Sequence, residues 1–403
     1  MYKKNILIKK RCICGGNLKE KIDFGKLPLI NDFKKIKTIK YPTIISQCLK
    51  CFLVQLKYAV KDSLIFPKNY SYLSADSHEK IKDYKDLIAK ISSRFLRYKP
   101  MIVDIGGNDG SLMQIAKNKN FLELNIEPTN VANISKERGI KTLKKKFNSR
   151  TANDLKKNKL LFDFVISTNF FAHTNNLNEI IEGVKKIIKN DGILIIEAQY
   201  IYKVLKANGF DSFHQDHKYY YSINSMSRIL KIFDLHVFDV EFLKHQPEII
   251  RIFASKKIKK KTIRYNKILK IENDKEIVKK IKKLNTFRVK YIVKIKNLIK
   301  KLNHQKKNIY GISASPRGCV LLNSGNFNKK NIKMIGEMSK SFKLKKLIPG
   351  TNIQIKDENS ILIDQPDFVV ILAWHLKHRL MKSLRKRGYK GKFIIPLPKI
   401  KIL

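Results

Sequence analysis

The stretch MIVDIGGNDG, residues 101–110, decides the fold class of this 403-residue chain. Its first half is apolar apart from Asp104, as in a buried strand, and its second half is a glycine-bearing turn before a helical run that begins at Ser111. Glycine permits positive φ angles and lets the backbone approach a ligand closely. Open α/β sheets bind adenosine-type cofactors at such an edge. A tight turn without a ligand is the alternative.

An acidic residue after the next predicted strand supports the cofactor interpretation. Glu127 ends the run LNIE, residues 124–127. A carboxylate there can accept hydrogen bonds from both ribose hydroxyls of an adenosine, although a solvated acid would give the same pattern. We predict a cofactor site formed by Asp104, Gly106, Asn108, Asp109, Gly110, Glu127 and Pro128.

Apolar runs and helical stretches alternate on both sides of this turn. The predicted strands are residues 101–105, 121–127, 162–167 and 192–198, and later residues 308–312, 366–374 and 392–396. Such alternation predicts parallel sheets with helices on both faces. We expect an α/β fold with a Rossmann-like core at residues 61–255 and a smaller Rossmann-like domain at residues 305–403. Residues 1–60 are rich in turns and short strands.

Two helices are predicted from the spacing of apolar residues. The first spans residues 78–98, and its apolar face is Ile81, Tyr84, Leu87, Ile88, Ile91 and Phe95. The second lies in a helical linker at residues 256–304, and its coiled-coil-like seam is Ile277, Ile281, Leu284, Arg288, Tyr291, Ile295, Leu298 and Leu302. The seam can pack inside the chain, which we favour, or against a second copy. We expect a monomer or a homodimer.

The composition is strongly basic, with a net charge of +52. A nucleic-acid partner would explain this charge, but lysine is spread along every segment, which favours codon bias of the genome. We therefore expect no nucleic-acid partner, although the charge should attract an anionic substrate. No apolar run reaches the ~18 residues of a membrane span, and the N-terminus lacks a signal-peptide pattern. We expect a cytoplasmic protein that does not bind membranes.

Four of the five cysteines form two close pairs near the N-terminus, Cys12 with Cys14 and Cys48 with Cys51. Paired cysteines in a cytosolic chain indicate a metal more than a disulfide. Four thiolates suit a tetrahedral structural zinc ion, which leaves no open position for catalysis. Free or buried thiols are the alternative.

Several segments, in a shared order, resemble the family of sugar-nucleotide C-methyltransferases. They are CICGG (residues 12–16), FGKLPLINDF (24–33), CLKC (48–51), YSYLS (70–74), IGGNDG (105–110), IEP (126–128), NFFAH (169–173), PGTNI (349–353), PDF (366–368), AW (373–374) and FIIP (393–396). The resemblance covers nearly the whole chain. It implies a class I methyltransferase core that binds S-adenosylmethionine (SAM), a zinc-binding domain at residues 1–60 and a C-terminal domain related to nucleotide-binding folds. The family has a two-residue gap in its first cysteine pair, so its first cysteine would fall at Arg11.

Methyl transfer to carbon needs a carbanion, which forms when a base removes a proton next to a ketone. The resemblance implies that His217 is this base. Asp216 takes the position of a glutamate of the family, and His214 that of a tyrosine. The base is kept while its neighbours change, so we expect the family's reaction class on a different substrate. A pair of surface histidines is the alternative.

The resemblance also implies residues that contact the substrate. Asn169 and His173 would hold the keto oxygen or orient the sugar. Tyr70 and Tyr72 would close over the sugar, and Arg251 would line its site. Arg317 would bind a phosphate, as arginine does through paired hydrogen bonds. Each residue also has an ordinary alternative, such as a helix cap, a core aromatic or a solvent-facing arginine.

The predicted function is SAM-dependent C-methylation of a nucleotide-linked keto-sugar. A nucleic-acid methyltransferase would use the same cofactor, but residues 169–172 read NFFA where such an enzyme would carry an Asn-Pro-Pro-Tyr-type motif. A non-catalytic SAM-binding protein is the second alternative, because the histidine segment differs from the family pattern.

Overall fold

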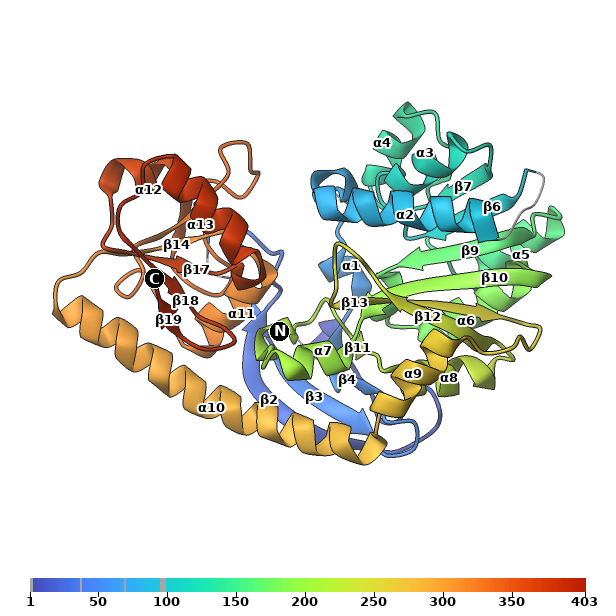
Figure 1. Ribbon diagram of the computed structural model, residues 1–403, viewed down its shortest axis with the longest axis horizontal. Coiled ribbons are helices and arrows are strands. Elements are labelled where there is room, and N and C mark those ends of the chain that lie inside the picture. Colours follow the sequence, from blue (N-terminus) through green and yellow to red (C-terminus); the bar gives the residue numbers. More distant parts are fainter. Residues whose placement is uncertain (1–2, 37, 69, 95–98) are drawn as a thin grey trace.

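The computed structural model describes residues 3–36, 38–68, 70–94 and 99–403, so the predicted helical residue Phe95 lies outside the described residues. Figure 1 shows the core, residues 61–255, on one side and the C-terminal unit on the other. The N-terminal strands and one long helix run below and between them. Among the described residues, none of the helices combines the length and hydropathy of a membrane span.

The core is a mixed sheet whose centre is parallel. Its strands are β6 (Met101–Ile105), β7 (Leu122–Ile126), β8 (Thr142–Leu143), β9 (Phe162–Thr168), β10 (Ile188–Gln199), β12 (His236–Phe242) and β13 (Ile249–Ser255). They lie in the order β12-β13-β10-β9-β6-β7-β8, and β12 and β13 are antiparallel to their neighbours. The chain reverses its direction of strand addition between β6 and β9, which is where doubly wound sheets bind ligands.

Helices cover both faces of this sheet (Figure 1). They are α2 (His78–Arg94), α3 (Ser111–Lys117), α4 (Val131–Glu137), α5 (Ser149–Lys157), α6 (Leu177–Ile187), α7 (Ile201–Lys206) and α8 (Ile223–Ile232). The apolar face of α2 is buried at Tyr84, Leu87 and Ile91, as predicted. The predicted core strands are confirmed, whereas the antiparallel edge of β12 and β13 was not predicted. Parallel central strands read as continuous apolar runs.

The C-terminal unit is a second sheet of mainly parallel strands, as predicted. Its strands are β14 (Ile309–Ile312), β15 (Met334–Glu337), β16 (Gln354–Asp357), β17 (Phe368–Ile371), β18 (Lys392–Ile395) and β19 (Lys401–Ile402). Its helices are α11 (Pro316–Ser324), α12 (Asn359–Asp364) and α13 (Lys377–Lys386). The strand order is β16-β15-β14-β17-β18-β19. The predicted strand at 366–374 ends at Ile371, and a 3-10 turn begins at Trp374.

The N-terminal region holds longer strands than predicted. It contains β1 (Ile6–Ile8), β2 (Leu18–Pro28), β3 (Lys40–Cys48), β4 (Val54–Leu56), β5 (Tyr58–Val60) and the short helix α1 (Asp62–Ile65). The β2–β3 hairpin lies beside β4, and β11 (Tyr219–Tyr220) pairs with β4 as the edge strand. The residues directly after His217 therefore belong to the N-terminal sheet.

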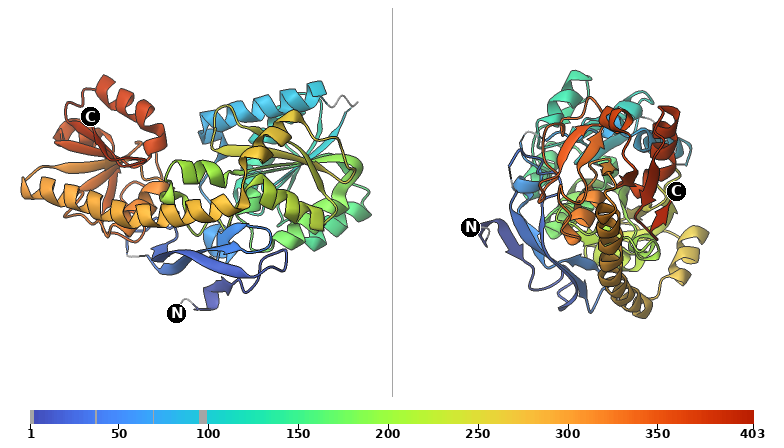
Figure 2. Two further views of the ribbon diagram at one scale, coloured as in Figure 1. Left: turned by 60° about the horizontal axis from the view of Figure 1, so that its bottom comes forward. Right: turned by 90° about the vertical axis from the view of Figure 1, so that its left-hand side faces the viewer.

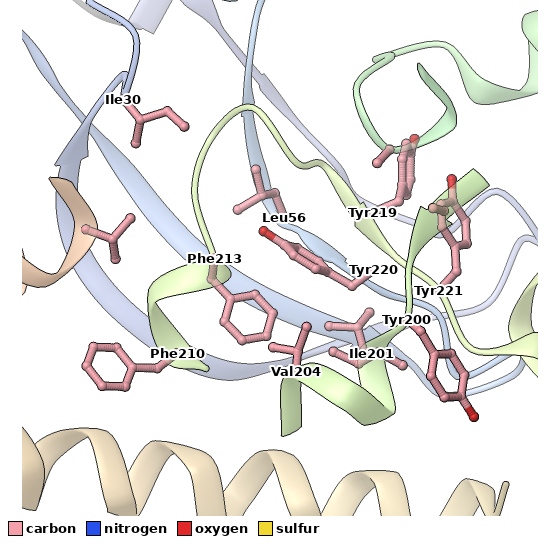
Figure 3. Packing of buried hydrophobic residues seen from close by; sticks show 14 of the residues in the cluster. Ile30, Leu56, Tyr200, Ile201, Val204, Phe210, Phe213, Tyr219, Tyr220 and Tyr221 are labelled. Carbon is pink, nitrogen blue, oxygen red and sulfur yellow. The ribbon is translucent and has the colours of Figure 1, made fainter. Parts of the chain in front are cut away.

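The long helix α10 (Asp274–His304) follows α9 (Ile263–Ile271) and runs along the molecule towards the C-terminal unit (Figures 1 and 2). The seam residues Ile277, Ile281, Leu284, Tyr291, Ile295 and Leu302 are buried in this single chain. Arg288 donates a hydrogen bond to the Asp23 carbonyl at 2.8 Å. Figure 3 shows the α10 ribbon below Phe210 and Val204. In the same buried cluster, the ring centroids of Phe213 and Tyr220 lie 4.5 Å apart. The predicted packing of the seam inside the chain is confirmed.

Candidate functional site

The turn after β6 has a shape that requires glycine. Gly106 and Gly110 have φ angles of +74° and +73°. A Cβ atom on Gly107 would lie 2.0 Å from Asn125 Oδ1, and one on Gly110 would lie 2.2 Å from Ser135 Oγ. A side chain at either position would collide with these atoms and push the turn away from them. The glycines therefore let the turn lie close against the edge of the sheet.

Asn108 and Asp109 tie this turn to the segment before α2. Asn108 Oδ1 accepts a hydrogen bond from Ser74 N at 2.8 Å, and its Nδ2 donates to the Tyr72 carbonyl at 3.0 Å. Asp109 accepts from Ala75 N at 3.0 Å. Both predicted cofactor residues therefore build the site through protein contacts, and their contact with the cofactor stays a prediction.

Two buried carboxylates lie at the ends of neighbouring strands. Glu127, followed by the exposed Pro128, accepts hydrogen bonds from Asn108 N at 3.2 Å and Thr129 N at 2.9 Å. Asp104 is 1% exposed, and neither of its carboxylate oxygens has a partner among the described residues. Burial raises the pKa of Asp104 to about 8. A buried polar group without a partner needs a ligand or water, so Asp104 fits the ammonium group of a bound SAM.

Three histidines lie together at the edge of the core. His173 follows β9, and His214 and His217 follow the 3-10 turn at Phe210–Ser212. The His217 ring centroid lies 4.9 Å from that of His173 and 4.5 Å from that of His214. The structure therefore brings together the three histidines that were predicted as catalytic, although His173 lies far from the other two in the sequence.

The tautomer of His173 follows from its partner. His173 Nδ1 lies 2.7 Å from the carbonyl oxygen of Asp216. A carbonyl oxygen can only accept a hydrogen bond, so Nδ1 carries the hydrogen and Nε2 keeps its lone pair. His173 therefore offers an acceptor to any substrate that reaches Nε2.

Burial keeps these imidazoles neutral. It lowers the pKa of His173 to about 3 and holds the pKa of His214 and of His217 well below the usual value. For His217, the neighbouring His173, Arg317 and Lys218 act in the same direction. A neutral imidazole is the form that can accept a proton.

The N-terminal region holds the histidine segment in place. Asn31 Nδ2 donates a hydrogen bond to Asp216 Oδ2 at 2.8 Å, and burial raises the pKa of Asp216 to about 7. Gln215 Nε2 donates to the Pro42 carbonyl at 2.8 Å. The buried Lys218 contacts Asp62 and the His173 carbonyl. The histidine site is therefore assembled from the N-terminal region and the core.

The C-terminal unit adds a positive charge beside the histidines. Arg317, near the start of α11, lies over Trp374 with 5.0 Å between its guanidinium carbon and the ring centroid. Trp374 Nε1 donates to Asp211 Oδ2 at 2.6 Å, which ties this unit to the histidine segment. The charge of Arg317 lowers the pKa of His214 and of His217, so the two groups are electrostatically coupled.

The remaining predicted residues differ in their placement. The Tyr70 ring lies 5.5 Å from Phe66, whose ring lies 5.5 Å from His173. Tyr72 is 45% exposed. Asn169 has a φ of +67° and takes the N-cap position of the 3-10 turn before His173, without a capping hydrogen bond from its side chain. Tyr70 and Asn169 thus lie near the histidines.

Arg251 is occupied by protein partners. Its Nε donates to Glu197 Oε1 at 2.8 Å, its Nη1 to Glu241 Oε1 at 2.7 Å and its Nη2 to the Asp83 carbonyl at 3.1 Å. The side chain is 2% exposed. This geometry gives Arg251 a structural role, and its contact with the substrate stays a prediction.

The four paired cysteines converge. Their Sγ atoms all lie within 4.8 Å of one another. Cys12 and Cys51 are 3.6 Å apart and Cys14 and Cys48 are 3.4 Å apart at sulfur, close to the ~3.8 Å edge of a tetrahedron with Zn–S bonds of ~2.3 Å. A Cβ atom on Gly16 would lie 2.7 Å from Cys48 Sγ. The shortened first gap therefore still allows a four-sulfur metal site.

Three positions in this site were not predicted. They are Asn31, Lys218 and Trp374. Asn31 and Trp374 lie inside segments that resemble the family, but no pattern showed that they meet the histidine segment. Lys218 gave no signal, because a lysine in so basic a chain is expected at the surface.

Comparisons with known proteins agree with this architecture. Residues 249–398 match the family model of the C-methyltransferase C-terminal domain, and residues 77–240 match that of a methyltransferase domain. The C-methyltransferase NovU of Streptomyces niveus is 22% identical over an alignment of 407 positions, which covers 97% of this chain and 96% of NovU.

Solved methyltransferase structures are similar over less of the chain. Mitomycin 7-O-methyltransferase is 15% identical with a TM-score of 0.35, over 43% of this chain and 53% of that one. Magnesium protoporphyrin IX methyltransferase of Synechocystis, with bound SAM, is 10% identical with a TM-score of 0.35, over 44% of this chain and 80% of that one.

The fold and the family matches together define a class I SAM-dependent methyltransferase. The chain carries a C-methyltransferase C-terminal domain and is similar to NovU over nearly its whole length, which supports a SAM-dependent C-methyltransferase. The predicted enzyme class is confirmed.

Proposed function

We propose that this C-methyltransferase methylates the carbon next to the ketone of a nucleotide-linked keto-sugar, with His217 as the base. The observation that carries the proposal is the cluster of neutral imidazoles coupled to Arg317. His217 removes the proton on the carbon beside the ketone and leaves an enolate. When bound, SAM supplies an electrophilic methyl group for that carbon.

Arg317 gives the site a means to strengthen its base when the substrate binds. The positive charge of Arg317 lowers the pKa of His217. A diphosphate bound at Arg317 would offset that charge, so the pKa of His217 would rise towards the working pH. The imidazole then becomes a better proton acceptor with the substrate in place.

The remaining polar residues orient the sugar. His173 Nε2 is an acceptor, so His173 receives a hydrogen bond from a sugar hydroxyl and cannot donate one to the keto oxygen while it is neutral. The Asn169 amide is able to donate to that oxygen and to the enolate that follows. Tyr70 packs near the same group through Phe66.

The proposal includes a structural zinc ion and a division into domains. Cys12, Cys14, Cys48 and Cys51 would hold zinc through four sulfurs. The domains are residues 1–60 for zinc binding, 61–255 for methyl transfer, 256–304 as a helical linker and 305–403 as the C-terminal Rossmann-like domain. Zinc in the first domain would stabilise the sheet that β11 completes.

The test is incubation of the purified enzyme with methyl-labelled SAM and a panel of nucleotide-linked 4-keto-sugars, followed by mass spectrometry. We expect one labelled methyl group on carbon for at least one sugar. Exchange of the α proton with deuterated solvent in that sugar should require His217. Methyl transfer to RNA with none to any keto-sugar would contradict the proposal.

A further inference from the structure

A buried lysine lies at the cofactor edge, and no acidic residue in the described part of the chain forms an ion pair with it. Lys80, in the first turn of α2, is 7% exposed. Its Nζ lies 5.5 Å from the Tyr72 ring centroid and 5.6 Å from that of Tyr84. The Tyr84 hydroxyl lies 3.1 Å from Thr168 Oγ1, at the carboxyl end of β9. Lys80 therefore lies near the carboxyl end of β9, at the edge of the sheet where doubly wound folds bind their ligands.

The charge of Lys80 is the second observation. Among the described residues, no carboxylate forms a salt bridge with it, and the nearby Glu197 is paired with Arg251 at 2.6 Å. Burial by itself would lower the pKa of Lys80, but Tyr84, Tyr72 and Glu197 outweigh it and raise the pKa. Lys80 stays cationic, and a buried ammonium group is costly unless an anion accompanies it.

Asp104 provides the opposite charge on the same edge. Both of its buried oxygens lack a partner among the described residues. Lys80 is the neighbour whose charge most opposes the rise in the pKa of Asp104, so the two groups interact across the site. Among the described residues they form no salt bridge with each other, so a lysine that hydrogen-bonds Tyr84 and a carboxyl group without a partner face the edge together. A zwitterionic α-amino acid has the complementary pair of charges.

We propose that Lys80 binds the carboxylate of the methionyl end of SAM, opposite Asp104, which faces the ammonium group. The proposal does not depend on the sugar substrate. It makes Lys80 a cofactor-binding residue, and it predicts that Lys80 does not increase the binding affinity of ligands that lack the carboxylate.

The test compares two ligands on two proteins by isothermal titration calorimetry. Lys80→Met keeps the length and apolar stem of the side chain but removes the charge. We expect Kd for S-adenosylhomocysteine to rise about 10- to 100-fold, as for the loss of a hydrogen bond to a charged group. Kd for decarboxylated SAM should stay within about twofold, because that ligand has no carboxylate. Lys85→Met, at an exposed position of the same helix, is the control and should change neither value.

The outcomes separate the proposal from its rivals. An equal loss of affinity for both ligands would mean that Lys80 only supports the fold, and unchanged affinity for both would mean that it does not touch the cofactor. Unchanged affinity with a lower kcat would place Lys80 on the substrate's enolate oxygen. Each of these overturns the proposal. Lys80→Gln repeats the comparison if the methionine variant does not fold. All titrations omit sugar, so a failure of the sugar panel leaves the result intact.

Discussion

The cofactor edge and the histidine cluster differ in how many parts of the chain build them. The cofactor edge is made by one turn, two strand ends and the segment before α2. The histidine cluster needs Asn31 from the N-terminal region, His173 and His217 from the core and Arg317 from the C-terminal unit. Cofactor binding can therefore survive changes that disable the chemistry, and the following predictions test that separation.

The largest effect should come from His217→Ala. The variant removes the proposed base, so kcat should fall about 10²- to 10⁴-fold, while Kd for S-adenosylhomocysteine stays unchanged. Rates with the best keto-sugar and calorimetry on the same sample give both numbers. His378→Ala, on the exposed side of α13, is the matched control. Full activity in His217→Ala would remove His217 as the base.

The next effect should come from Cys51→Ser. The variant takes one sulfur from the four-cysteine cluster, so zinc content measured by mass spectrometry should fall below the expected one ion per chain. Loss of a structural metal destabilises its domain, and we expect Tm to drop by at least about 5 °C. Because β11 follows His217 and pairs with β4, the rate should fall more than cofactor affinity.

A matched variant checks this interpretation. Cys319 is buried but lies far from the cluster in sequence and is not one of its members. Cys319→Ala should keep its zinc whatever it does to Tm. A wild-type protein purified without any zinc, with the activity of the enzyme intact, would show that the cluster is only a set of thiols.

The same comparison explains what the sequence could predict. The turn at 106–110 and its strands were predictable because a local run of residues determines them. The pairing of β11 with β4 joins residues more than 160 positions apart, so it carries no local pattern. Lys80 gave one unused signal: it precedes Tyr84, Leu87 and Ile91 at spacings of 4, 3 and 4, which puts a lysine on the apolar face of α2.

A smaller effect, confined to the cofactor edge, should come from Glu127→Gln. The amide keeps the size of the side chain but weakens hydrogen bonds to ribose hydroxyls, so Kd for SAM should rise about 10-fold. At saturating SAM, kcat should stay within about twofold of the wild type. A large loss of kcat at saturating SAM would mean that the cofactor edge and the histidine cluster do not act independently.

The smallest effect is a difference in pH dependence. His217 must be neutral to act as a base, and burial with His173, Arg317 and Lys218 holds its pKa below 6.5. The acid limb of kcat/KM, which reports the free enzyme, should therefore lie below pH 6.5. Activity at pH 6 should stay within about twofold of that at pH 8, whereas an unperturbed histidine would lose about fourfold. Arg317→Met removes one charge that lowers the pKa, so it should move the limb upward. A wild-type limb at pH 6.5 or above would mean that the cluster does not tune its base.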